Sequence, residues 1–221
     1  MFLYIFFLII LVYNIFMKEG IFMADTRIPT QARSIEKKNK IIEKGFELIC
    51  NEGYYHINTK DIAEYAGVST GIVYQYFHDK KEIFLEGVKN YSDKIFYPAL
   101  NILSSDDING NSISDLIEQI IDQFIQNHTI SFRAHEELMA MTYLDEDVAN
   151  LFKEKELDMT DRIVNVLENQ HIYLSNIREK VHLIISIVDN FCHEVVYHKH
   201  DSINYDNMKK EVIEVIKFLL K

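Results

Sequence analysis

Four residues near position 70 have the chemistry to recognise nucleic acid, and helical spacing places them on one side of a short helix. They are Thr70, Gly71, Tyr74 and Gln75. A glutamine amide can hydrogen-bond an adenine edge in two places, a threonine can meet a base or a thymine methyl group, and a tyrosine hydroxyl can hold a phosphate. This side of the helix carries no large aliphatic group, so the spacing predicts a surface that contacts DNA.

The residues around this helix predict two short helices joined by a tight turn. Thr59 can cap the first helix, and two small alanines let a second helix approach closely. Gly67 can take the positive φ that ends a helix, and Ser69 can cap a second helix over residues 70–77. Together they form a helix-turn-helix whose second helix is placed to enter a DNA major groove.

The same stretch resembles the N-terminal domain of the tetracycline-repressor (TetR) family, at dense and fixed spacing. The shared residues read Thr59-x-x-Ile62-Ala63-x-x-Ala66-Gly67-Val68-Ser69-x-Gly71-x-x-Tyr74-x-Tyr76-Phe77-x-x-Lys80-x-x-Ile83. The resemblance implies that Thr59, Ser69, Tyr74, Tyr76 and Lys80 hold phosphates, and that Thr70, Gly71 and Gln75 face bases. Lys60 is included in the predicted set of DNA contacts.

Composition predicts an all-α protein. The chain has 221 residues, of which 48% are hydrophobic, with only 7 glycines and 2 prolines, and no strand-like alternation persists. Residues 23–81 are expected to form the helix-turn-helix domain, and residues 82–221 a ligand-binding and dimerisation domain. About nine helices are expected, over residues 34–51, 59–66, 70–77, 80–100, 112–128, 132–143, 145–170, 176–197 and 205–220. Pro98 should end or kink the fourth, and residues 104–111 should form a loop.

The charge is distributed unevenly between these two parts. The net charge is −11, but residues 23–81 hold nine basic and eight acidic side chains, whereas residues 82–221 hold 13 basic and 25 acidic ones. The acidity therefore belongs to the C-terminal domain, which would repel DNA and confine contact to the N-terminal domain.

The first 22 residues need a separate explanation. Sixteen of the first seventeen are apolar, which is near the lower length limit for a membrane helix. Lys18-Glu19-Gly20 back-translates to a purine-rich stretch that can contain a ribosome-binding sequence just before Met23. We therefore favour Met23 as the start and a cytoplasmic protein; the alternative is a membrane anchor at residues 1–17.

Side chains in the C-terminal domain suggest a small apolar ligand between bundle helices, because they combine aromatic, flexible and polar ends. The candidates are Phe124, His128, Phe132, Met139, Tyr143 and Phe191. Core packing is the competing interpretation for each of them. The family resemblance implies that the last two helices, at residues 176–197 and 205–220, pair with a second copy in a homodimer.

No enzymatic motif, cofactor or metal site is expected. The chain has no glycine-rich phosphate loop, G-x-S-x-G or H-E-x-x-H pattern. His193 and Glu194 are adjacent and point apart on a helix, so we expect no metal ion in the histidine-rich segment that also holds His198 and His200. Cys50 and Cys192 lie among apolar residues, as reduced, buried thiols do.

These observations favour a DNA-binding transcriptional regulator, most simply a repressor that binds a palindromic operator as a dimer and responds to an unidentified small-molecule effector. Two alternatives stay open. One is a membrane-tethered regulator that uses residues 1–17, and the other is a helical interaction protein whose N-terminal domain no longer binds DNA. The sequence gives neither the operator nor the effector.

Overall fold

The computed structural model describes residues 32–103, 112–129 and 132–221, and these residues form helices and connecting turns only. The all-α prediction is confirmed. The helices are α2 (Ala32–Glu52), η1 (Tyr54–His56, a 3₁₀ turn), α3 (Thr59–Tyr65), α4 (Thr70–Tyr74), α5 (Lys80–Leu103), α6 (Ile113–His128), α7 (Phe132–Leu144), α8 (Glu146–Asn169), α9 (Ile177–Val196) and α10 (Tyr205–Leu219).

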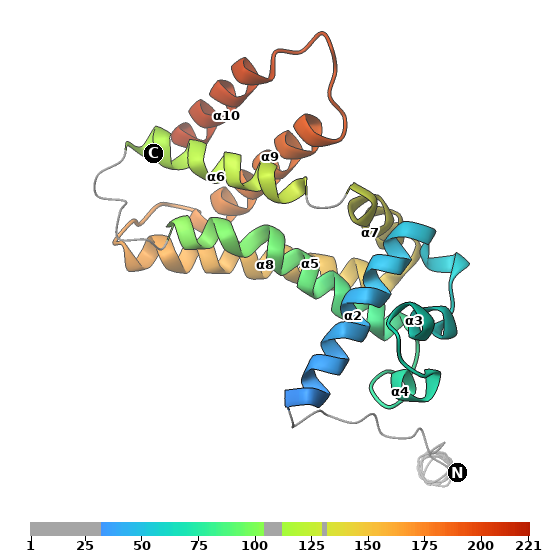
Figure 1. Ribbon diagram of the computed structural model, residues 1–221. Coiled ribbons are helices and arrows are strands. Elements are labelled where there is room, and N and C mark those ends of the chain that lie inside the picture. Colours follow the sequence, from blue (N-terminus) through green and yellow to red (C-terminus); the bar gives the residue numbers. More distant parts are fainter. Residues whose placement is uncertain (1–31, 104–111, 130–131) are drawn as a thin grey trace, which may run out of the picture.

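The N-terminal head consists of α2, α3 and α4, packed at one end of the molecule (Figure 1). Its core is built from fully buried aliphatic side chains on each helix, such as Ile49 on α2, Ile62 on α3 and Val73 on α4. The small Ala63 and Ala66 are buried where α3 meets its neighbours, as their spacing predicted. The head is therefore held by the apolar stripes that the sequence shows.

Two glycines let α2 and α5 pack closely. A Cβ atom at Gly45 would lie 2.6 Å from the Ile83 side chain, and one at Gly87 would lie 2.4 Å from Phe46. Neither position has room for a larger residue without movement of a neighbour. Helix α5 is thereby fixed against the head at its N-terminal end.

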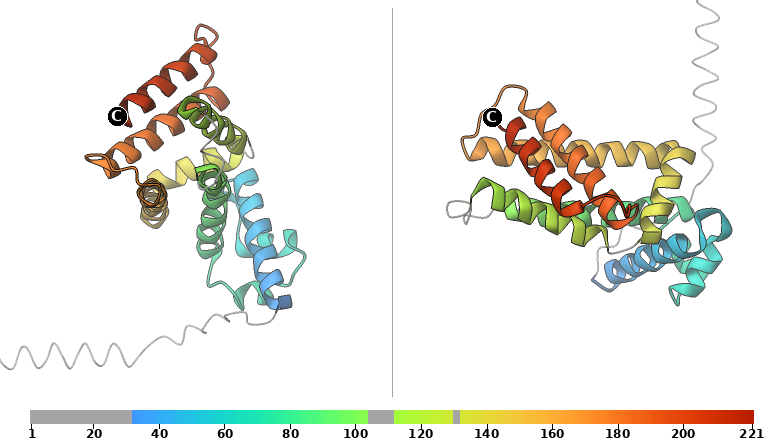
Figure 2. Two further views of the ribbon diagram at one scale, coloured as in Figure 1. Left: turned by 90° about the vertical axis from the view of Figure 1, so that its left-hand side faces the viewer. Right: turned by 90° about the horizontal axis from the view of Figure 1, so that it is seen from above.

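The body consists of α5 to α10. Helices α5 and α8 lie side by side, α6 and α9 pack across them, and α10 lies against α9 and α6 (Figures 1 and 2). Helix α5 thus belongs to both parts, because it begins in the head and continues through the body.

Polar contacts join the head to the body at two further places. The Tyr54 amide donates to Glu137 Oε1 on α7 at 2.6 Å. The Lys81 ammonium lies 2.8 Å from Asp145 and 2.6 Å from Asp147, at the start of α8. The orientation of the head therefore depends on α7 and α8 as well as on α5.

Most predicted helix boundaries are correct to about one residue, but the first helix-turn-helix cap was misplaced. Asn58, not Thr59, caps α3: its side chain accepts from the Lys60 and Asp61 amides, while Asp61 accepts from the Asn58 amide. Thr59 is instead the first residue of the helix. Both residues suit a cap chemically, and the capping box with Asp61 selects Asn58.

Two other predictions near helix ends also need correction. Helix α4 ends at Tyr74, so it is shorter than the predicted segment 70–77. Helix α5 does not end at Pro98 but continues to Leu103, with α6 and α8 packed against it. The predicted loop at 104–111 and the apolar segment at 1–17 lie outside the described residues. Within the described part, no helix has the length and apolar character that crossing a membrane requires.

Candidate functional site

Helix α4 presents the predicted DNA-reading residues on the surface. Ser69 caps the helix by accepting from the Ile72 amide, and Val73 anchors its inner side with no exposed surface. On the outer side, Gly71 and Gln75 are exposed and Tyr74 is 53% exposed, while Thr70 is partly exposed. The structure therefore brings the predicted base-facing residues together on one accessible face.

The backbone of this face is open at Gly71. A Cβ atom built there would have no atom of the described residues within 4 Å. The glycine is therefore not needed for packing inside the chain, unlike Gly45 and Gly87. A glycine with empty space in front of it lets a ligand approach the helix backbone closely.

Positive charge lies beside the turn between α3 and α4. Gly67 has a φ of 67°, as predicted, and a Cβ atom there would lie 3.7 Å from Lys40 Nζ. Lys60 is exposed in the first turn of α3, and Thr59 is partly exposed next to it. These groups can contact phosphates on either side of a groove that α4 enters.

Two predicted phosphate contacts have internal partners instead. Tyr76 is 7% exposed, and its hydroxyl lies 2.8 Å from Ser34 Oγ on α2. Lys80 Nζ donates to the carbonyls of Tyr54 and Ile57, at 2.6 and 2.8 Å. Burial lowers the pKa of Lys80. These contacts depart from what the family resemblance implies: the buried Tyr76 hydroxyl closes the head core, and Lys80 retains one N–H for any phosphate.

The body contains a small cavity that only part of the predicted ligand set lines. Its walls come from α5, α6, α7, α8 and α9, and they include His128 and Met139 from that set, together with residues that were not predicted: Tyr91, Ser92, Ile95, His135, Leu138, Phe152, Asp189 and His193. Its volume of about 20 Å³ accommodates a water molecule or an ion and no organic molecule.

The other predicted ligand residues lie elsewhere. Phe124 is buried behind the cavity and stacks on His128, with ring centres 6.1 Å apart. Phe191 is buried but faces the hollow between α9 and α10. Phe132 and Tyr143 are 48% and 88% exposed, because both lie on the outer side of α7. The six residues therefore do not form one pocket.

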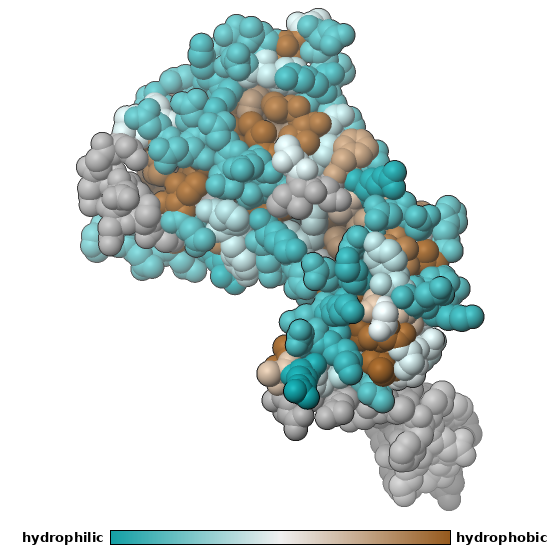
Figure 3. Space-filling view, viewed as in Figure 1, coloured by the Kyte–Doolittle hydropathy of each residue, from teal (hydrophilic) through white to brown (hydrophobic). Residues whose placement is uncertain are grey.

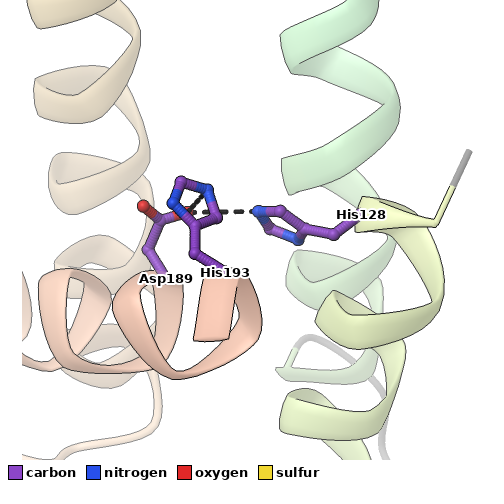
Figure 4. A group of neighbouring side chains, drawn as sticks. All are labelled: His128, Asp189 and His193. Carbon is purple, nitrogen blue, oxygen red and sulfur yellow. Dashed lines mark hydrogen bonds and ion pairs between the residues drawn. The ribbon is translucent and has the colours of Figure 1, made fainter. Parts of the chain in front are cut away.

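The cavity also brings together three groups that the sequence analysis did not associate. His128 reaches from the end of α6 toward Asp189 and His193 on α9 (Figure 4). Asp189 and His193 are four residues apart, so they share one face of α9. The expectation of no metal site rests on His193 and its neighbour Glu194, and it does not use the four-residue spacing between Asp189 and His193.

The ionisable groups that line the cavity alter one another's pKa values. Burial, reinforced by His193 and His128, lowers the pKa of His135 to about 4, so this ring is neutral at physiological pH. Burial would raise the pKa of Asp189, but the neighbouring His128 and His193 outweigh it and hold that pKa below its usual range. Asp189 is therefore a carboxylate surrounded by nitrogen-bearing rings.

Comparison with known proteins identifies the head. A family model described as bacterial regulatory proteins, tetR family, matches residues 41–86, which cover most of α2, all of α3 and α4, and the start of α5. The N-terminal head therefore matches the tetR family. This is a family of transcriptional regulators and not of enzymes.

Curated relatives match part of the chain. The HTH-type transcriptional regulator HbdR of Aromatoleum sp. is 41% identical over 58 residues, which cover 26% of this chain and 25% of that protein. The HTH-type transcriptional activator FasR of Mycolicibacterium smegmatis is 24% identical over 98 residues, or 44% of each chain. The chain thus aligns with less than half the length of these curated relatives.

Solved structures share the fold over most of the chain. A TetR-family regulator from Mesorhizobium loti superposes with a TM-score of 0.67 at 17% identity, covering 86% of this chain and 98% of that one. A transcriptional regulator from Saccharomonospora viridis, solved in complex with choline, gives 0.57 at 15% identity, covering 83% and 96%. At such identities the likeness shows the fold alone.

Proposed function

We propose that this chain is a ligand-responsive transcriptional regulator of the tetR family that acts in the cytoplasm as a repressor on a near-palindromic operator. The observation that carries the proposal is the exposed face of α4, which combines an accessible glutamine amide, a tyrosine hydroxyl and an open backbone at Gly71. These groups suit base edges and phosphates, and no packing contact among the described residues requires the glycine there.

The proposed homodimer forms through α9 and α10. Large apolar side chains are exposed on these helices, with Leu183 at 48%, Val215 at 44% and Phe218 at 73%. A hollow between the two helices is lined by Ile187 and Met208 among others, and apolar side chains gather in this region of the surface in Figure 3. Pairing with a second copy would cover this surface and set two α4 helices roughly 34–36 Å apart, one helical turn of DNA.

The proposed effector acts through the body. Helix α5 runs from the head into the wall of the cavity, so a change in its position would alter the separation of the two heads. One fold relative was solved with choline, and another is described as a fatty acid degradation regulator from Bacillus halodurans. An effector can change DNA affinity only by its preference for one arrangement, typically by about 1–3 kcal/mol.

DNA binding is testable by fluorescence anisotropy with the purified protein and DNA from upstream of its own gene. Tyr74→Ala should weaken binding to every sequence, because it removes a phosphate contact. Gln75→Ala should relax the choice at one base step by about 1–3 kcal/mol. Tyr173→Ala, at a 72% exposed tyrosine in the body, is the matched control and should change neither property.

The readout separates this proposal from its alternatives. Salt-sensitive binding that prefers the upstream DNA over scrambled DNA and requires Tyr74 supports a regulator. If neither upstream DNA nor DNA selected from a random pool binds above the scrambled control, the head does not read DNA. The chain would then be a helical interaction protein.

A further inference from the structure

Three potential ligand atoms converge where α6 meets α9. His128 Nε2 lies 3.2 Å from Asp189 Oδ1, and His193 Nε2 lies 3.7 Å from the same oxygen. The ligand atoms of all three residues lie within 4.8 Å of one another. Figure 4 shows the His128 ring directed at the Asp189 carboxylate and the His193 ring next to that carboxylate.

The hydrogen bond on the far side of His128 defines which of its nitrogens is protonated. His128 Nδ1 lies 2.8 Å from the carbonyl oxygen of Phe124. A carbonyl can only accept, so Nδ1 carries the hydrogen and, in the neutral ring, Nε2 carries a lone pair. That lone pair is directed at a carboxylate oxygen, and His128 is only 2% exposed. A positive species must therefore lie between the two atoms.

A proton on His128 Nε2 could lie between this nitrogen and Asp189 Oδ1, but the distances between the three ligand atoms fit a metal ion better. A tetrahedral ion with bonds of about 2.0–2.1 Å needs ligand atoms about 3.3–3.4 Å apart. The two observed separations, 3.2 and 3.7 Å, lie on either side of that value. His193 Nε2 is directed at the same oxygen, so an ion placed between them could be held by both rings and the carboxylate.

The cavity beside the three ligand atoms has room for a fourth ligand. Its volume of about 20 Å³ holds one water molecule, and the buried Tyr91 side chain lines it. A water molecule bound to the ion would fit there.

We propose that His128, Asp189 and His193 bind one divalent transition-metal ion, with a fourth position open toward the cavity. Two imidazoles and one carboxylate suit Zn²⁺, Co²⁺, Ni²⁺ or Fe²⁺, whereas Mg²⁺ and Ca²⁺ prefer oxygen ligands throughout. The Nδ1–H bond from His128 to a backbone carbonyl is the outer contact that usually orients a metal-bound histidine. The Asp189 side chain is 35% exposed, which gives the ion a route of entry.

The ion would join α6 to α9 beside α5 and so fix the centre of the body. The site does not depend on the proposed DNA-binding function, because it is built from body residues alone. Its test therefore needs no operator and can fail or succeed separately.

The test is a titration of untagged, chelator-treated protein with Co²⁺, followed by visible absorbance, and with Zn²⁺, followed by calorimetry. We expect one ion per chain and absorbance bands typical of Co²⁺ bound to nitrogen and oxygen. Asp189→Asn and His193→Gln should each weaken binding at least about tenfold, since even outer contacts to a ligand change affinity by that much. Asparagine can still donate to His128 Nε2, so this variant should fold.

His182→Gln is the matched control, because His182 is exposed on the same helix and outside the cavity. It should bind both ions as the wild type does, and circular dichroism should show all three variants folded. The proposal is overturned if the folded wild type binds no stoichiometric ion, or if Asp189→Asn and His193→Gln bind as tightly as His182→Gln. A proton on His128 would then satisfy the cluster.

Discussion

Replacing Gly71 by alanine should separate DNA binding from stability. The substitution adds one methyl group to the outer face of α4, where a Cβ atom would meet no atom of the described residues within 4 Å. Gly71 has no positive φ, so alanine fits its backbone without strain. The folded head should therefore accept the change, whereas a DNA backbone or base edge against the helix should not.

The magnitudes follow from this geometry. Alanine is favoured over glycine in a helix by up to about 1 kcal/mol, and at this chain length that raises Tm by about 2–4 °C. When DNA binds, the added methyl group would prevent one close contact between the DNA and the helix. We take the free energy of that contact to be similar to that of one good base contact. Losing it costs about 1–3 kcal/mol, or about 5–150-fold in Kd.

The assay pairs thermal unfolding with anisotropy on the operator, and Gly87→Ala is the contrast. A Cβ atom at Gly87 would lie 2.4 Å from Phe46, so overpacking should lower stability by about 1–3 kcal/mol. The face of α4 stays unchanged in that variant. Unaltered operator affinity in Gly71→Ala, with Tm equal or higher, would refute the close approach of DNA to this backbone.

Two smaller predictions concern the head. Asn58→Ala should lower the free energy of unfolding by about 1 kcal/mol, and Thr59→Ala by less, because Asn58 supplies the capping bonds; urea unfolding compares the two. Tyr76→Phe should cost about 1 kcal/mol of stability, because it leaves the buried Ser34 hydroxyl without its partner. Operator affinity measured below the unfolding transition should stay within about twofold if Tyr76 makes no phosphate contact.

The helices could be predicted because each depends on local signals. Apolar side chains at helical spacing predict α6 to α10, and the structure agrees to about one residue. Capping side chains also begin α6, α8 and α10. At Pro98 the sequence predicts an end or a kink of the helix, because a proline is judged from local geometry. The helix does not end there, and the packing of α6 and α8 on α5 is not visible in the sequence.

The same distinction between local signals and packing of distant segments applies to the candidate sites. The face of α4 was predictable because its residues lie on a single turn-and-helix unit. The cavity was not, since His128 and Asp189 are 61 positions apart and their meeting depends on how α6 crosses α9. The one local signal was the four-residue spacing between Asp189 and His193. Tyr76 is the opposite case: the family resemblance implies a phosphate contact, and the packing of α2 places its hydroxyl beside Ser34.

The position of α7 explains how the cavity and the head can influence each other. His135 on this helix lines the cavity and lies 4.2 Å from the His193 ring, between ring centres. Two residues later, Glu137 accepts the hydrogen bond from the Tyr54 amide of the head. A shift of α7 that accommodates a change around His193 must therefore also move or break a charge-assisted contact to the head. Such a bond contributes about 1.5–3 kcal/mol, which is enough to supply the full 1–3 kcal/mol by which effectors typically change affinity at a distant site.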